Sequence, residues 1–109
     1  MPFTVAEIVK PMMAAAQESL AKDWGQAKDY ARPELKRLAT SLADIAKLIA
    51  ADKVNRRQAK ALLRIHRNTT LTVLLTVEGL GVVAVEDAIN AALGAVRDVV
   101  NTAVGFRLV

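Results

Sequence analysis

An almost uncharged stretch of eighteen residues, 68–85, limits what this chain can fold into more than any other feature. Glu78 is the single charged residue within it, and a strongly basic segment comes directly before it. Apolar surface of this extent is stable only when it is removed from water. The fold therefore depends on whether another part of the chain, a second subunit or lipid covers the stretch.

From residue 71 onward, apolar or small residues recur at alternate steps of three and four, the period of one helix face. This pattern predicts helix from residue 55 to about residue 104. Such a helix would be about 75 Å long at about 1.5 Å per residue, whereas a compact chain of this size has a radius of gyration of about 13 Å. The chain must therefore fold back near Gly79 and Gly81, or partner subunits must cover the remainder.

A competing interpretation of residues 70–77 is a β-hairpin. Their sequence, TLTVLLTV, mostly alternates threonine with leucine or valine, and nine of residues 68–85 are β-branched. Gly79 and Gly81 would then form the turn. We favour helix, because the three-four spacing continues through both glycines and because a lone two-stranded hairpin is only marginally stable in water.

Two capping signatures mark the starts of helices in the rest of the chain. Thr4 with Glu7, and Asn55 with Gln58, have the spacing in which each side chain satisfies the other residue's backbone amide. Pro11 then predicts a kink or a restart of the first helix, since proline cannot donate to the carbonyl one turn back.

The next helix is predicted to start at Pro33, after the first helix ends near Trp24 and Gly25. The negative charge of Glu34 would then interact favourably with the positive N-terminal end of the helix dipole. The apolar residues of this helix also alternate in steps of three and four, as in a coiled-coil seam: Leu35, Leu38, Leu42, Ile45 and Ile49. The connection that follows is short, so this helix and the next should be antiparallel neighbours.

A chain of 109 residues is expected to form a single helical domain, 1–109. Apolar residues make up 53% of it and aromatic residues only 4%, so its core must be built mainly from Ala, Val, Leu and Ile. Such side chains suit closely packed helices. We predict an all-α fold, a small helical bundle with a long C-terminal helix that is bent near Gly79 and Gly81.

Basic residues concentrate at mid-chain, where residues 34–67 hold nine basic and three acidic residues, for a net charge of +6. Five of them recur in steps of four and three and would line one helix face: Lys53, Arg57, Lys60, Arg64 and Arg67. Such a row is a candidate anion contact, for nucleic-acid phosphates or for lipid headgroups. A solvated helix face is the plainer alternative, and no aromatic residues lie between the cations to stack on bases.

The apolar face of the long helix is the candidate self-association surface. It consists of Leu71, Leu75, Glu78, Val82, Val85, Ile89, Val96 and Val99. A buried, unpaired carboxylate is costly, so Glu78 needs a partner from another helix or subunit unless a bend exposes it to water. The candidate partners are Arg32, Arg37 and Lys47.

The sequence offers no catalytic or metal-binding pattern. It has no cysteine and one histidine, His66, without a cluster of carboxylates around it. The segment from Gly79 to Gly81 lacks the lysine and the third glycine of a phosphate-binding loop, and Ser19 and Ser41 have no nearby base to activate them. We therefore expect no enzymatic activity, no cofactor and no metal.

A membrane-spanning segment at 68–85 is the next alternative. These residues reach the lower limit of a spanning length, but a central carboxylate costs about 2.5–3.5 kcal/mol, and no aromatic belt flanks them. The first residues lack an apolar core followed by a cleavage site. They predict a cytoplasmic protein, with membrane association as the alternative.

The function expected from these features is a non-enzymatic helical assembly or protein-interaction module, a homo-oligomer that self-associates through its Ala/Val/Leu-rich face. One alternative is a small membrane protein with a Glu78-bearing span at 68–85. The other is a nucleic-acid-binding helical dimer that uses the basic residues of 53–67. The three hypotheses differ in whether protein, lipid or nucleic acid is the partner.

Overall fold

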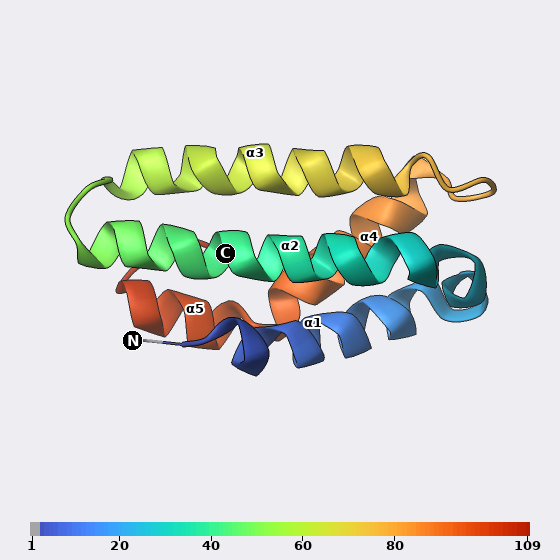
Figure 1. Cartoon of the computed structure of the whole chain (residues 1–109), viewed down its shortest axis with the longest axis horizontal. Helices are drawn as coiled ribbons and strands as arrows, with labels where there is room; N and C mark the ends of the chain where they lie inside the picture. The colour runs from blue at the N-terminus through green and yellow to red at the C-terminus, as the bar shows by residue number, and fades with distance from the viewer. Residues whose placement is uncertain (1–2) are drawn as a thin grey trace.

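Helices make up all of the regular structure in residues 3–109, the part of the chain that the computed structural model describes. In chain order they are α1 (Val5–Leu20), the 3₁₀ helix η1 (Ala21–Asp23), α2 (Trp24–Ala50), α3 (Arg56–Leu74), α4 (Val82–Ala95) and α5 (Arg97–Val104) (Figure 1). No strand occurs among the described residues. The predicted all-α bundle is therefore confirmed, and the hairpin alternative at 70–77 is wrong.

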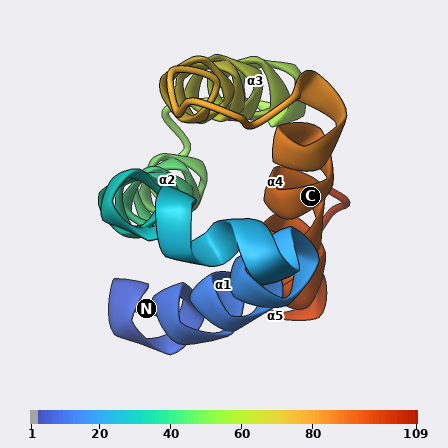
Figure 2. The same ribbon diagram turned by 90° about the vertical axis from the view of Figure 1, so that its right-hand side faces the viewer.

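The four longer helices run back and forth in a body of 42 × 22 × 19 Å. α2 packs along both α1 and α3, while α4 packs closely against α1 and meets α3 over a smaller area. Seen end-on in Figure 2, α3, α2 and α1 follow one another from top to bottom, and α4 and α5 lie to one side of them. α4 thereby covers the side of the core that the first three helices leave open.

Side chains cap α1 and α3 at the predicted residues, but at α1 the predicted reciprocal pair is only half formed, because Glu7 Oε1 accepts from the Thr4 hydroxyl at 3.2 Å and not from the Thr4 amide. Thr4 Oγ1 accepts a hydrogen bond of 3.3 Å from the Glu7 amide. At α3 the reciprocal pair is complete, because Asn55 Oδ1 accepts from the Gln58 amide at 2.8 Å and Gln58 Oε1 accepts from the Asn55 amide at 2.9 Å. These bonds satisfy amides that have no partner within the helix.

Neither the prolines nor the first glycine interrupts a helix, so the predicted restart at Pro11, helix end at Gly25 and helix start at Pro33 are wrong. α1 continues through Pro11, and α2 begins at Trp24 and continues through Gly25 and Pro33. Both prolines lie on exposed sides of their helices, where water can bond the carbonyls that they leave without a donor. The segment before Pro33 stays helical because it buries Trp24 and Ala27 in the core.

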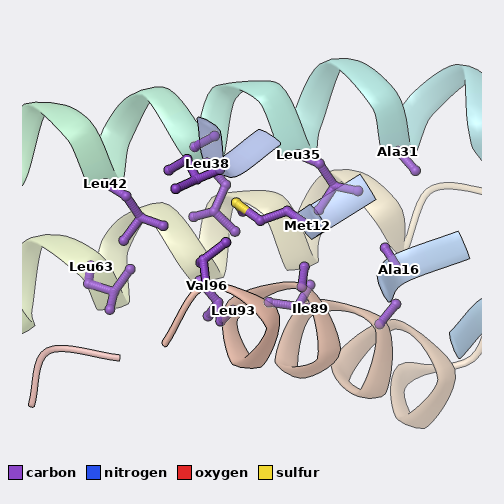
Figure 3. Packing of buried hydrophobic residues seen from close by; sticks show 14 of the residues in the cluster. Met12, Ala16, Ala31, Leu35, Leu38, Leu42, Leu63, Ile89, Leu93 and Val96 are labelled. Carbon is purple, nitrogen blue, oxygen red and sulfur yellow. The ribbon is translucent and has the colours of Figure 1, made fainter. Parts of the chain in front are cut away.

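The predicted seam of α2 is confirmed. Four of its residues are at most 2% exposed, and the fifth, Ile49, is partly buried against the core. The four are Leu35, Leu38, Leu42 and Ile45. Figure 3 shows side chains from α1, α2, α3 and α4 pointing into this shared core, among them Met12, Leu63 and Ile89.

Small side chains let α4 lie close to α1. Ala16 of α1 and Ala88 and Ala92 of α4 are at most 1% exposed, and the absence of bulk beyond Cβ allows two helix backbones to approach. Met12 and Ile89 fill the space beside them and are both fully buried. The apolar C-terminal half is therefore covered largely by the N-terminal helix of the same chain.

Between α3 and α4 the chain reverses direction. α3 ends at Leu74, and Gly79 has a positive φ of 88°, a conformation that a side chain would disfavour. Within the turn the Leu80 amide donates to the Val77 carbonyl at 3.2 Å. The chain therefore bends where the sequence predicts, and this bend reverses its direction completely. A long C-terminal helix is not confirmed, because α2, with 27 residues, is the longest helix of the described chain.

The C-terminal tail is held against the bundle. Asn101 Oδ1 accepts from the amides of both Leu108 and Val109 at 2.9 Å, and Leu108 is buried. The ring of Phe106 lies under the guanidinium of Arg56, with 5.2 Å between its centroid and the guanidinium carbon. The tail therefore contacts the Arg56 side chain at the start of α3.

Candidate anion-binding and self-association surfaces

α3 carries the largest net charge of the helices in the described chain. None of its nineteen residues is acidic. Five are basic and are called the cationic flank below: Arg56, Arg57, Lys60, Arg64 and Arg67. The adjoining side of α3 supplies Ala59, Leu63, Thr70 and Leu74 to the interior. Because the first and last cations contact the C-terminal tail and α4, the flank lies on the side of α3 that is next to α4.

Both ends of the cationic flank are held in place without losing their charge. Arg67 Nη2 donates to Asn90 Oδ1 of α4 at 2.8 Å, and Arg56 stacks over Phe106. An amide oxygen and an aromatic ring carry no net charge, so neither contact neutralises a guanidinium. The one ion pair within residues 3–109 joins Arg37 and Glu34 of α2, so no carboxylate of this part of the chain pairs with the flank.

The structure brings most of the predicted anion contacts to one surface. Three of the five are exposed on α3: Arg57, Lys60 and Arg64. Lys53 is exposed in the connection before α3, and Arg67 is half-buried against α4. Sequence reasoning left out Arg56, although it lies one turn before Lys60 and hence on the same side of the helix.

The predicted self-association face is divided between the core and the surface. Three of its residues, Val85, Ile89 and Val96, are at most 1% exposed, in part because α4 packs against α1. They cannot contact a second copy of the folded chain, which corrects that part of the prediction. Leu71 is partly buried against the core. Four residues remain at the surface: Leu75, Glu78, Val82 and Val99.

Exposed apolar side chains gather where α3 ends and α4 begins. Leu75, Val82 and Val83 are 37%, 52% and 72% exposed, and we call them the apolar end. They flank the α3–α4 turn at one end of the bundle (Figure 1). Sequence reasoning missed Val83, because it lies off the three-four spacing of the predicted helix face. Glu86 and Asp87 are exposed one turn further along α4 and give the apolar end a charged border.

Glu78 is exposed in the α3–α4 turn, which removes the predicted need for a buried partner. Its backbone carbonyl accepts a hydrogen bond from Gln26 Nε2, which ties the turn to the first turn of α2. Residues 68–85 are therefore two helix ends joined by a turn and not one segment. No helix within residues 3–109 has both the length and the apolar character that a membrane crossing requires.

The buried charge of this fold is Glu34, which is 4% exposed. Its Oε1 lies 3.1 Å from Arg37 Nη1, whereas Oε2 has no hydrogen-bond partner among the described residues. The interpretation of Glu34 as a helix-start residue is wrong, because α2 starts ten residues earlier, at Trp24. A signal was present in the sequence: Glu34 lies three residues after Ala31 and four before Leu38, which are both buried.

Metal-binding clusters and hollows are the other kinds of functional feature that the described surface could carry. No group of three or more His, Cys, Asp or Glu side chains within residues 3–109 is placed to hold a metal ion. A shallow, open hollow on α5 is lined by Asp98, Val99, Thr102 and Ala103. Asp98 is the titratable side chain among these lining residues, so the hollow provides no acid–base pair.

No protein-family model, curated protein or solved structure matches this chain. Two surfaces of the described chain are candidate functional sites, the apolar end and the cationic flank. They differ in chemistry and use different side chains.

Proposed function

We propose that this protein is a non-enzymatic interaction module that self-associates weakly through the apolar end. The observation that supports the proposal is the exposure of Leu75, Val82 and Val83 at one end of the bundle, while most other apolar residues of α4 are buried. When exposed apolar side chains pack against each other, they leave water and the free energy of the system falls. A patch that complements itself favours a two-fold dimer.

The composition of the apolar end suits a small interface. Val82 and Val83 are β-branched and stiff at χ1, so docking them costs little side-chain entropy. The exposed carboxylates of Glu86 and Asp87 lie beside the valines and would remain in water at the border. Protein interfaces commonly combine an apolar centre with such a polar rim.

The small size of the apolar end limits the affinity. Complete burial of one valine or leucine contributes about 1.5–3 kcal/mol, and these three side chains are already partly covered. Association itself costs at least about 4 kcal/mol in lost translational and rotational freedom. We therefore expect a dimer with a dissociation constant of about 0.1–1 mM.

Sedimentation equilibrium tests this proposal. The average mass of the wild-type protein should rise from 11.7 kDa toward twice that value as its concentration rises from about 10 µM to about 1 mM. The Val83→Asp variant should stay at 11.7 kDa over the same range. The substitution removes apolar contact area and would bury a charge in the interface.

Val99→Asp is the matched control, because Val99 is also an exposed valine, at 46%, but lies on α5. This variant should associate like the wild type. A wild-type protein that remains monomeric at the highest concentration would refute self-association. Equal loss of association in both variants would show that the apolar end is not the contact surface.

A further inference from the structure

A second surface runs along the side of the molecule, starting at the opposite end of α3 from the apolar end. The cationic flank places five positive charges within residues 56–67, and α3 has no acidic residue to offset them. We propose that this flank binds the phosphate backbone of double-stranded nucleic acid. This proposal does not depend on self-association, because the two surfaces share no side chain.

The spacing of the cations suits two rows of phosphates. Four of them follow in steps of three, four and three and stay on one side of the helix: Arg57, Lys60, Arg64 and Arg67. Arg56 and Arg67 are about 17 Å apart along the helix axis at about 1.5 Å per residue. The major groove of a duplex is about 12 Å wide. Cations at the two ends of the flank can therefore reach phosphates on both sides of one groove.

Two of the five side chains are held in position before any ligand arrives. Arg67 uses one N–H for its bond to Asn90, and Arg56 lies over the ring of Phe106. A guanidinium has five N–H donors, so both side chains keep donors for phosphate oxygens. Holding them in place reduces the rotamer entropy that binding would otherwise remove.

The flank fits a duplex better than a single strand. Single-strand binding relies on aromatic side chains on which bases stack, and α3 contains no aromatic residue other than His66. Tyr30, the large aromatic side chain that is 52% exposed, belongs to α2. The contacts available on α3 are therefore charge contacts, which read the backbone and not the bases.

The flank also fits phosphates of nucleic acid better than a lipid surface. A helix that lies in a bilayer surface inserts its apolar side, but the apolar side of α3 faces the core of this bundle. Ile65, at 59%, is the large apolar side chain of α3 that is more than half exposed. Four of the five cations are arginines, whose planar fork of donors matches phosphate oxygens in pairs.

Fluorescence anisotropy with a labelled 20-bp DNA duplex tests the proposal, with protein kept below about 10 µM so that little of it self-associates. With about four phosphates neutralised, the affinity of the wild type should fall about 100-fold between 50 mM and 200 mM salt. In the double variant Arg57→Ala/Arg64→Ala, the affinity at 50 mM salt should be at least about 10-fold lower. The slope of log affinity against log salt should be smaller by about two.

Lys10→Ala/Lys22→Ala is the matched control, because it also lowers the net charge from +4 to +2 but changes exposed cations of α1 and η1. Its duplex affinity should stay within about twofold of the wild type. Circular dichroism should show unchanged helix content in both double variants, since all four side chains are exposed. Val83→Asp should bind the duplex like the wild type.

Four results would overturn the assignment to a duplex. The first is no salt-dependent binding by the wild type, and the second is equal loss in the two double variants. The third is tighter binding to a single-stranded 20-mer of the same sequence. The fourth is tighter binding to vesicles that contain about 30% phosphatidylserine, since anionic lipid would then be the preferred ligand.

Discussion

Replacing Ile89 by alanine should lower the free energy of unfolding by about 2–5 kcal/mol. Ile89 is 0% exposed, and Figure 3 shows it in the same core as Met12 of α1 and Val96. The truncation removes buried methyl and methylene groups and leaves a cavity that the packed helices around it cannot close. Urea unfolding followed by circular dichroism, at a protein concentration well below that of dimer formation, measures this change.

Val82→Ala provides the comparison within the same helix. Val82 is 52% exposed, so its truncation should change the free energy of unfolding by no more than about 0.5 kcal/mol. Both residues belong to the helix face that the sequence predicts for self-association. If Ile89 instead faced a second subunit, its truncation would alter the dependence of stability on protein concentration and would hardly affect the monomer. Equally small effects for the two variants would therefore refute the packing of α4 against α1.

Replacing Glu34 by methionine should raise the free energy of unfolding by about 1–3 kcal/mol. The carboxylate is 4% exposed, and its Oε2 has no hydrogen-bond partner among the described residues. The loss of water from this oxygen is therefore not compensated by a protein donor. Methionine has a similar volume and no charge, and its flexible chain adapts to the existing space.

Replacing Arg37 by alanine should have the opposite sign. It should lower the free energy of unfolding by about 1–2 kcal/mol, because it leaves the Glu34 carboxylate buried without a cation. The expected loss is below that for a fully buried pair, because the Arg37 side chain is 60% exposed. In the Glu34→Met background, the same Arg37 substitution should be almost neutral. A Glu34→Met variant less stable than the wild type would show that this carboxylate is well satisfied.

The features that the sequence predicts correctly depend on residues close together in the chain. The bonds between Asn55 and Gln58 span three residues, so their spacing alone sets the start of α3. The seam of α2 is buried as predicted over about three turns, from Leu35 to Ile45. Four of the five residues of the cationic flank could be predicted for the same reason, because residues three and four apart share a side of any helix.

The wrong helix boundaries come from interactions over longer distances. Gly25 and Pro33 are both poor helix formers, but packing of Trp24 and Ala27 into the core keeps this region helical. Glu34 then falls inside the buried side of α2 instead of in a first turn. Local helix propensity cannot reveal this outcome, because the contacts that stabilise this part of α2 are made with residues of other helices.

The extent of the self-association surface could not be predicted for a similar reason. The three-four spacing indicates that one side of α4 is buried, but it does not identify the element that covers it. Here α1 covers Val85 and Ile89, and the exposed residues are those near the turn. The most exposed of them, Val83, lies off the spacing and is recognised only once the path of the chain is known.

Methyl NOE spectroscopy on a mixture of isotope-labelled and unlabelled protein, at about 1 mM so that dimer is present, tests most directly whether the chain covers its own apolar half. NOEs between Met12 and Ile89 should arise within one chain, because both side chains lie in the core shown in Figure 3. NOEs between labelled and unlabelled chains should be confined to the apolar end, including Val83. Intermolecular NOEs to Ile89 or Val96 would instead show that a second subunit covers the C-terminal half.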